Sequence, residues 1–277
     1  MVNLAELAFC GFIGIFSLRF ANRTARSARA FRSIFRIESD KVHEVIDGEP
    51  AAIEGAVIVD EPAYAADRTV DHTDSAVGAY LWRATFPKSN KKVIDFKNRN
   101  IRQARITFAS GMEFGEFSVA NNKRKIRVDP TWLLESHEST RLAELTAHGL
   151  NSDNAIAISL WDSPHIRLTG TKTKRTLDQL RDLTNTRDSK GLDSYHIESK
   201  PIHEDTTIAI YGNIRIEQGE PVIYGTDETP LTISEQGFDG LRNSLRFKIV
   251  KNGLVFLFSL SIIVFIFIEN FHEYLIF

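Results

Sequence analysis

The sequence predicts an α+β protein in which a mostly β globular domain lies between two transmembrane helices. Three observations support this fold class. Apolar residues are concentrated at both ends of the chain, short β-branched runs fill the middle, and Lys and Arg cluster on the inner side of each apolar end. We expect a first transmembrane helix at residues 4–20, a basic juxtamembrane linker at 21–48, the β-rich domain at 49–245 and a second transmembrane helix at 249–269.

The C-terminal apolar stretch is the clearest signal. Residues 253–268 read GLVFLFSLSIIVFIFI and contain no charged residue. With Ile249 and Val250 the stretch approaches the ~20 residues that cross a bilayer core. A buried core helix is the alternative, but such a helix rarely carries Phe and Ile on every face. We therefore predict a membrane span.

The N-terminal apolar stretch is shorter and less regular. Residues 4–18 read LAELAFCGFIGIFSL, and Glu6 interrupts them. A cleaved signal peptide is the alternative to a span. Signal peptides carry basic residues before the apolar core, whereas here no basic residue precedes Leu4 and a run of arginines follows. This pattern favours an anchor whose N-terminus is outside.

Basic residues set the predicted orientation. Four of them, between residues 242 and 251, precede the second span, and a set of arginines follows the first one. The positive-inside rule then places the middle domain in the cytoplasm and both termini outside. In helical projection the arginines share one broad arc, so they either contact an anionic lipid surface or form a solvated connector. They are Arg19, Arg23, Arg26, Arg29, Arg32 and Arg36.

The middle of the chain predicts short strands with a few helices. β-branched and aromatic runs bounded by Gly, Pro, Asn and Asp predict strands at residues 52–59, 77–86, 101–108, 116–120, 125–128, 206–211, 213–216 and 222–224. Helical spacing of leucines predicts helices at 140–149 and 176–183, and Ser234 caps a helix that continues into the second span. These elements form one mixed domain or two lobes that meet near residue 150.

The sequence predicts no catalytic residue, no cofactor and no metal site. The one cysteine, Cys10, lies in the first apolar stretch, and no HExxH, GxSxG, GxGxxG or GxxxxGK[ST] motif is present. Two groups of His and Glu are interpreted as surface residues rather than metal ligands; they are His196, Glu198, His203 and Glu204, and His137, Glu138 and His148. A Ser-His-Asp triad stays open, because geometry rather than sequence order defines it.

Two further features have alternative interpretations. The turn at Thr169-Gly170-Thr171, with Lys172, Lys174 and Arg175, is a solvated loop or a contact for lipid headgroups. Aromatic residues at 78–86 and 115–120 are typical of a strand core, and the alternative is an OB-like barrel that stacks nucleic-acid bases. Because the middle domain as a whole has no basic excess, we expect no nucleic-acid partner.

The order of these features resembles that of the GIDE-type membrane-anchored ubiquitin ligases of mitochondria, whose shared region is the BAM ("beside a membrane") domain. The resemblance is carried by residues 53–59 (IEGAVIV), 78–82 (GAYLW), 115–120 (GEFSVA) with 126–130 (IRVDP), and 208–236, which end in PLTISEQ. It implies a β-rich domain between two spans. Those ligases also carry a zinc-binding RING finger after the second span, whereas here nine residues follow Ile268 and the single cysteine is Cys10.

Three functions follow as hypotheses. The first is a non-catalytic binding or scaffold module that recruits a protein partner at the membrane. The second is a component of a ubiquitin-ligase-like system whose catalytic part lies on another chain. The third is an envelope protein that binds lipid headgroups. Membrane lipids and one protein of unknown identity are the expected partners.

Overall fold

A computed structural model of the chain describes residues 4–38, 46–71, 75–95, 100–122, 124–137, 139–146, 159–186 and 191–275. The chain divides into two compact units. Asp40–Phe238 is a globular domain, and Met1–Ser39 with Asp239–Phe277 is a helical unit. This division supports an α+β fold in which helix and strand are segregated.

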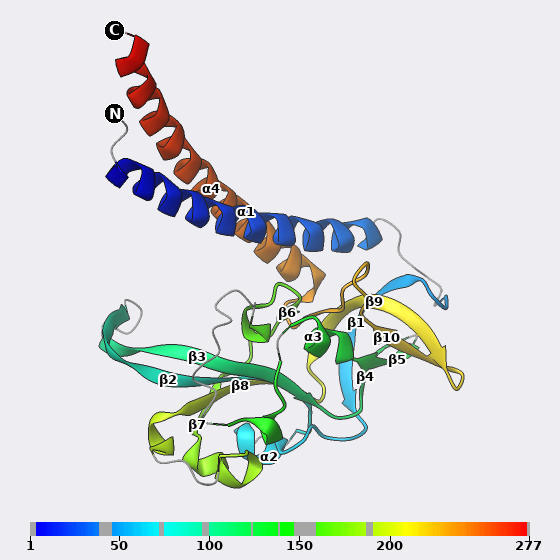
Figure 1. Cartoon of the computed structure of the whole chain (residues 1–277). Helices are drawn as coiled ribbons and strands as arrows, with labels where there is room; N and C mark the ends of the chain where they lie inside the picture. The colour runs from blue at the N-terminus through cyan, green and yellow to red at the C-terminus, as the bar shows by residue number, and fades with distance from the viewer. Residues whose placement is uncertain are drawn as a thin grey trace. The chain divides into compact units, whose positions relative to one another are not determined.

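Five strands of the globular domain close into a small barrel (Figure 1). Their order is β1-β4-β5-β10-β9, and β9 pairs back with β1. The β5–β10 pair is parallel and the other pairs of the ring are antiparallel. Closure leaves these strands with few free edges. Their bounds are β1 Pro50–Val59, β4 Phe117–Asn121, β5 Arg124–Asp129, β9 Thr207–Glu217 and β10 Glu220–Tyr224.

Two short strands extend the barrel sheet, and four strands form a second sheet. The strand β11 (Thr232–Ser234) pairs with β9 and with β6 (Ile166–Arg167). The second sheet is antiparallel with the order β3-β2-β8-β7. Its strands are β2 Val77–Asp95, β3 Asn100–Phe114, β7 Thr173–Thr176 and β8 His196–His203.

The second sheet is buried on both faces, as the alternation along β2 shows. Ala79 and Leu81 join the core that includes the barrel side chains. Tyr80 and Trp82 point the other way, into a second core built with short helical turns. Those turns are α2 Ala66–Thr69, η1 Leu142–Glu144, η4 Asp178–Leu183 and η5 Leu192–Ser194, while α3 Thr131–Glu135 and η3 Leu160–Asp162 adjoin the first core.

Both sheets combine strands from the two halves of the chain. In the second sheet β2 from the first half pairs with β8 from the second, and in the barrel β1 pairs with β9. The alternative of two lobes that meet near residue 150 is therefore wrong. A single unit, Asp40–Phe238, holds both sheets.

The helical unit consists of α1 (Leu4–Glu38) and most of α4 (Gly237–Leu275). The guanidinium of Arg246 lies over the ring of Phe31 at 5.4 Å, which joins the two helices. In the described part of the chain, α4 is the one helix long and apolar enough to cross a membrane, with a mean hydropathy of 2.3 over its best window in Gly237–Ile266. The second predicted span is thus shown as a candidate.

The first predicted span is not shown. Residues 4–20 are helical, but they belong to α1, which continues without a break through residue 38 of the predicted linker. The polar and basic residues of its second half give α1 a mixed character. Among the described residues α1 does not reach the apolar character that α4 has.

Several local predictions need correction. The two strands predicted at 206–211 and 213–216 are one strand, β9, because Gly212 pairs with Ala51 in register instead of making a turn. A Cβ at Gly212 would lie 2.5 Å from the Tyr224 carbonyl oxygen, so close strand packing explains this glycine. The helices predicted at 140–149 and 176–183 are the short turns η1 and η4, and residues 147–149 lie outside the described part.

Candidate functional site

A group of polar contacts in the globular domain surrounds Glu198 on β8. Arg83 on β2 lies directly opposite in the strand register, and its Nε and Nη2 are each 2.7 Å from Glu198 Oε2. Lys172, which precedes β7, places its Nζ 2.8 Å from Glu198 Oε1. The side chain of Glu198 is only 9% exposed, so two cations neutralise one buried carboxylate.

An aromatic ring and a third cation complete this group. The Arg83 guanidinium lies over the ring of Trp161 in η3, 4.6 Å from the ring centre. The Lys200 ammonium lies 5.2 Å from the same ring centre. Lys200 lies two residues after Glu198 on the same strand and donates to the Leu168 carbonyl oxygen at 3.0 Å. We call Arg83, Trp161, Lys172, Glu198 and Lys200 the charged cluster.

The turn at residues 169–171 is attached to this cluster. Glu235, just after β11, accepts hydrogen bonds from the Thr169 hydroxyl and from the Gly170 N–H, both at 2.9 Å. Lys172 is bound to Glu198, and Arg175 Nη2 is 3.0 Å from Asp71. The turn predicted as a solvated loop or headgroup contact is therefore held by the sheet and by the residue that leads into α4.

Burial and charge shift two pKa values in the cluster in a consistent direction. Burial alone would raise the pKa of Glu198, but the hydrogen bonds from Lys172 and Arg83 outweigh it and hold the pKa below its ordinary value. Burial lowers the pKa of Lys200, and repulsion from Arg83 and Lys172 adds to this although Glu235 opposes it. The cluster thus contains more positive than negative charge, with three cations and one carboxylate.

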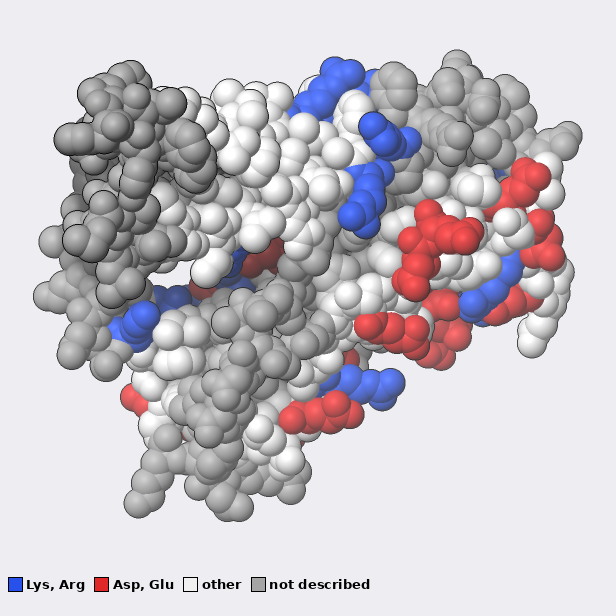
Figure 2. All heavy atoms as spheres, turned by 45° about the horizontal axis from the view of Figure 1, so that its top comes forward, with Lys and Arg blue, Asp and Glu red and all other residues white. Residues whose placement is uncertain are grey.

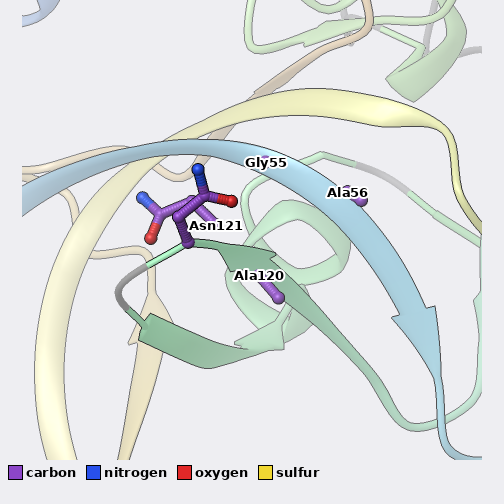
Figure 3. A pocket seen from close by; sticks show the side chains of 5 residues that line it. Gly55, Ala56, Ala120 and Asn121 are labelled. Atoms are coloured by element: carbon purple, nitrogen blue, oxygen red, sulfur yellow. The ribbon is translucent and has the colours of Figure 1, made fainter.

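An open hollow of about 500 Å³ lies at another place, on the barrel. Figure 3 shows Gly55 and Ala56 on β1 beside Ala120 and Asn121 at the end of β4. A Cβ at Gly55 would be 2.1 Å from the Ala120 carbonyl oxygen. The Asn121 side-chain oxygen accepts from the Arg124 N–H at 3.1 Å and closes the β4–β5 turn. These residues offer amide and backbone groups for hydrogen bonding, without a titratable side chain.

The histidine and carboxylate groups identified in the sequence are not brought together. His196 and His203 are the first and last residues of the eight-residue strand β8, so their backbones are about 23 Å apart. His137 instead lies near His165, with ring centres 6.3 Å apart, and both contact Trp132. His148 and Glu138 lie outside the described residues. Within that described part, no group of three His, Cys, Asp or Glu side chains is placed to hold a metal ion.

The arginines predicted to contact a membrane surface all lie on α1. Arg19, Arg23, Arg29 and Arg32 are exposed, whereas the side chains of Arg26 and Arg36 are outside the described part. Figure 2 shows blue basic side chains on the surface of the helices, separated by uncharged ones. The contact of Arg246 with Phe31 brings the basic start of α4 next to the arginine-bearing half of α1. Two basic segments far apart in sequence therefore adjoin within the helical unit.

Comparison with protein-family models, with curated proteins and with solved structures found no match.

Sequence reasoning missed the charged cluster because its members come from four separate segments. Residues 196–203 read HIESKPIH, which has little of the β-branched character that marks a strand. The available signal was the two-residue period of a strand. Glu198, Lys200 and Ile202 fall on one face of β8, and Ile197 and Ser199 fall on the other.

Proposed function

We propose that this chain is a membrane-anchored binding module with no catalytic activity of its own. Its globular domain is held at the cytoplasmic face of a bilayer and binds a protein partner there. The observation that carries the proposal is α4, which begins three residues after β11 and continues as one helix through the apolar segment. The domain is thus coupled directly to a candidate span.

The proposed topology has two spans. The first half of α1 crosses the bilayer, the arginine-bearing half emerges on the cytoplasmic side, and α4 crosses back. The distribution of Lys and Arg supports this, because these residues follow the first apolar stretch and precede the second one. Snorkelling of flanking side chains accommodates the short apolar length at residues 4–18.

The family assignment is also a proposal. Most of the segments that resemble the GIDE-type BAM domain correspond to β1, β4, β5, β9 and β10, which together close the barrel. The resemblance therefore concerns one structural unit and not scattered matches. It implies a partner from a ubiquitin-ligase-like system as one specific case of the binding role.

Alkaline extraction of membranes that contain the full chain tests the anchoring. We expect the chain to stay with the lipid pellet, together with known integral proteins. Release into the supernatant with peripheral proteins would remove the basis of the proposal.

Crosslinking in the same membranes tests the binding role, for which we expect a defined protein in fixed ratio to the chain. Modification of a substrate by the purified chain alone would contradict a non-catalytic role.

Contact of the helical unit with anionic lipid is a second candidate function. The observation that favours it is the convergence of basic residues from α1 and α4 at the Arg246–Phe31 contact. Each cation near an anionic leaflet contributes about 1 kcal/mol. Replacing Arg19, Arg23, Arg29 and Arg32 by Gln should weaken association with anionic vesicles, while association that ignores lipid charge would exclude this function.

A further inference from the structure

The first half of β1 has a strand partner on one edge only. β9 pairs with β1 along residues 50–56, whereas β4 meets the other edge only at residues 56–59. Among the described pairings, no third strand joins β1. Figure 3 shows β1 running on past the end of β4 at Asn121. We call residues 50–54 of β1, on the side that faces away from β9, the open edge.

The hydrogen bonds to β9 show which backbone groups face the open edge. Opposite residues of an antiparallel pair alternate between exchanging two hydrogen bonds and exchanging none. The Val57 N–H donates to the Thr206 carbonyl oxygen at 3.0 Å. At the start of β1, the Ile214 N–H donates to the Glu49 carbonyl oxygen at 2.9 Å. Odd-numbered residues of β1 therefore bond to β9, and even-numbered residues point their N–H and C=O groups to the other side.

Ala52 and Glu54 are the residues whose N–H and C=O groups face the open edge. Ala56, the next even-numbered residue, lies opposite Ala120 on β4. Within the described part of the chain, no strand lies opposite Ala52 or Glu54 on this side. Pro50 adds a carbonyl oxygen but has no N–H. The hollow of about 500 Å³ lies beyond the end of β4, where a longer β4 would continue. An added strand would therefore find both donors and acceptors there.

The side chains beside the open edge define the chemistry of a strand that would fit it. Ile53 belongs to the barrel core, so Ala52 and Glu54 point outward, because successive side chains of a strand alternate. Glu54 is exposed, and its carboxylate is in none of the ion pairs found among the described residues. Opposite charges on directly opposite residues stabilise a strand pair. The added strand should therefore carry a basic residue opposite Glu54 and apolar residues on its inward face.

A second copy of the chain does not match the open edge. If Ala52 faced Ala52 of another copy in a symmetric antiparallel pair, Glu54 would lie opposite Pro50, which has no N–H to donate. If Glu54 faced Glu54 of the copy, two carboxylates would oppose each other, which is destabilising. The observations therefore favour a strand from a different chain.

We propose that the open edge binds an extended segment of the partner protein, which adds to β1 as an antiparallel strand beyond the end of β4. The direction follows that of β4, which is antiparallel to β1. In such strand addition, main-chain hydrogen bonds supply affinity and alternate side chains supply specificity. The segment alternates apolar residues with basic ones, one of which pairs with Glu54. This inference rests on the proposed function, because it names how the binding module holds its partner.

The test measures binding of a fluorescein-labelled pentapeptide, VKVKV, to the full chain in detergent by fluorescence anisotropy. In the proposed register its two lysines lie opposite Ala52 and Glu54, so their N–H groups bond to β1. N-methylation of both lysine nitrogens should weaken binding by on the order of tenfold, because these hydrogen bonds are lost. N-methylation of the second and third valines instead should leave the affinity unchanged, since their N–H groups face away from β1.

Variants of the chain test the open edge from its own side. Ala52→Pro removes one N–H of the edge and leaves the hydrogen bonds to β9, which odd-numbered residues make, so it should weaken peptide binding by about tenfold. Glu54→Lys should also weaken it, because like charges would then oppose each other. Glu220→Lys makes the same change of charge at an exposed position of β10 and should bind as the natural chain does.

Tryptophan fluorescence checks that each variant is folded. If Ala52→Pro does not fold, the two methylated peptides decide the question with the natural chain. Equal affinity for these two peptides would overturn the inference, because binding would not depend on the main chain at this edge. Binding of none of the peptides would also overturn it, and Glu54 would then be a charge that keeps the edge from pairing.

Two further results separate this inference from its alternatives. A dimer of the full chain that Ala52→Pro dissociates would overturn it in favour of a second copy. A protein that crosslinks to the chain in membranes while no peptide binds would overturn this inference alone and leave the proposed function standing. Failure of the anchoring shows separately in alkaline extraction, which does not involve the peptide.

Discussion

Glu198 is the residue on which the charged cluster depends. Replacing it by Gln keeps the volume but leaves Arg83 and Lys172 without their shared carboxylate. We expect the free energy of unfolding to fall by about 2–3 kcal/mol, because partly buried cations lose a charged hydrogen-bond partner. Denaturant unfolding of the full chain in detergent, followed by tryptophan fluorescence, measures this. The exposed Glu220→Gln is the control, and an equal effect of both changes would contradict the role of Glu198.

The pKa of Glu198 gives this stability a pH dependence. Since the folded-state pKa lies below the ordinary value of 4.5, the carboxylate stabilises the fold fully above the unfolded-state pKa, and this contribution is lost as the pH falls through the folded-state pKa. Acidification from neutral pH should therefore lower the unfolding free energy of the natural chain more than that of Glu198→Gln. Parallel pH curves for the two chains would refute this assignment.

Gly55 tests the packing of the barrel. A Cβ there meets backbone, the Ala120 carbonyl oxygen, at 2.1 Å, so Gly55→Ala forces β1 and β4 apart. We expect a loss of about 1–3 kcal/mol of unfolding free energy. Gly170→Ala is the matched control, because its nearest neighbour is Glu235 Oε1 at 3.7 Å. Unchanged stability of Gly55→Ala in the same unfolding assay would show that the close approach is not required.

At the scale of single elements, the sequence predicted strands where β-branched residues dominate. β1, β4 and β5 lie within one or two residues of their predicted bounds. β8 was missed because Glu198 and Lys200 make it polar, and β9 was divided at Gly212 because a glycine that permits close packing looks the same in sequence as one in a turn. Whether such a residue lies within a strand or in a turn depends on the strand that pairs with it, and the local sequence does not identify that strand.

The apolar segment of α4 permits a direct test of its role as a span. Leu260 lies in the middle of residues 253–268 and Phe247 precedes them, and both side chains are exposed. Leu260→Arg should release a substantial fraction of the chain from membranes, since Arg at the centre of a span costs about 2.5–3.5 kcal/mol. Phe247→Arg should have little effect. Alkaline extraction compares the two, and equal retention would argue against a span at this position.

At the scale of the whole molecule, pairings between distant segments could not be predicted. β1 pairs with β9 and β2 with β8, so both sheets combine strands more than 100 residues apart. The pattern of short strands was compatible with one domain or with two lobes, and these long-range pairings show a single domain. The charged cluster could not be predicted for the same reason, because the fold brings its members together from four separate segments of the chain.

The topology of the domain is the central claim, and one labelling experiment tests it most directly. With Cys10→Ala and the exposed Asn122→Cys, a membrane-impermeant maleimide is applied to intact cells that contain the full chain. We predict no labelling until the cells are lysed, which places the globular domain in the cytoplasm. Labelling of intact cells would put the domain outside and contradict the orientation derived from the basic residues.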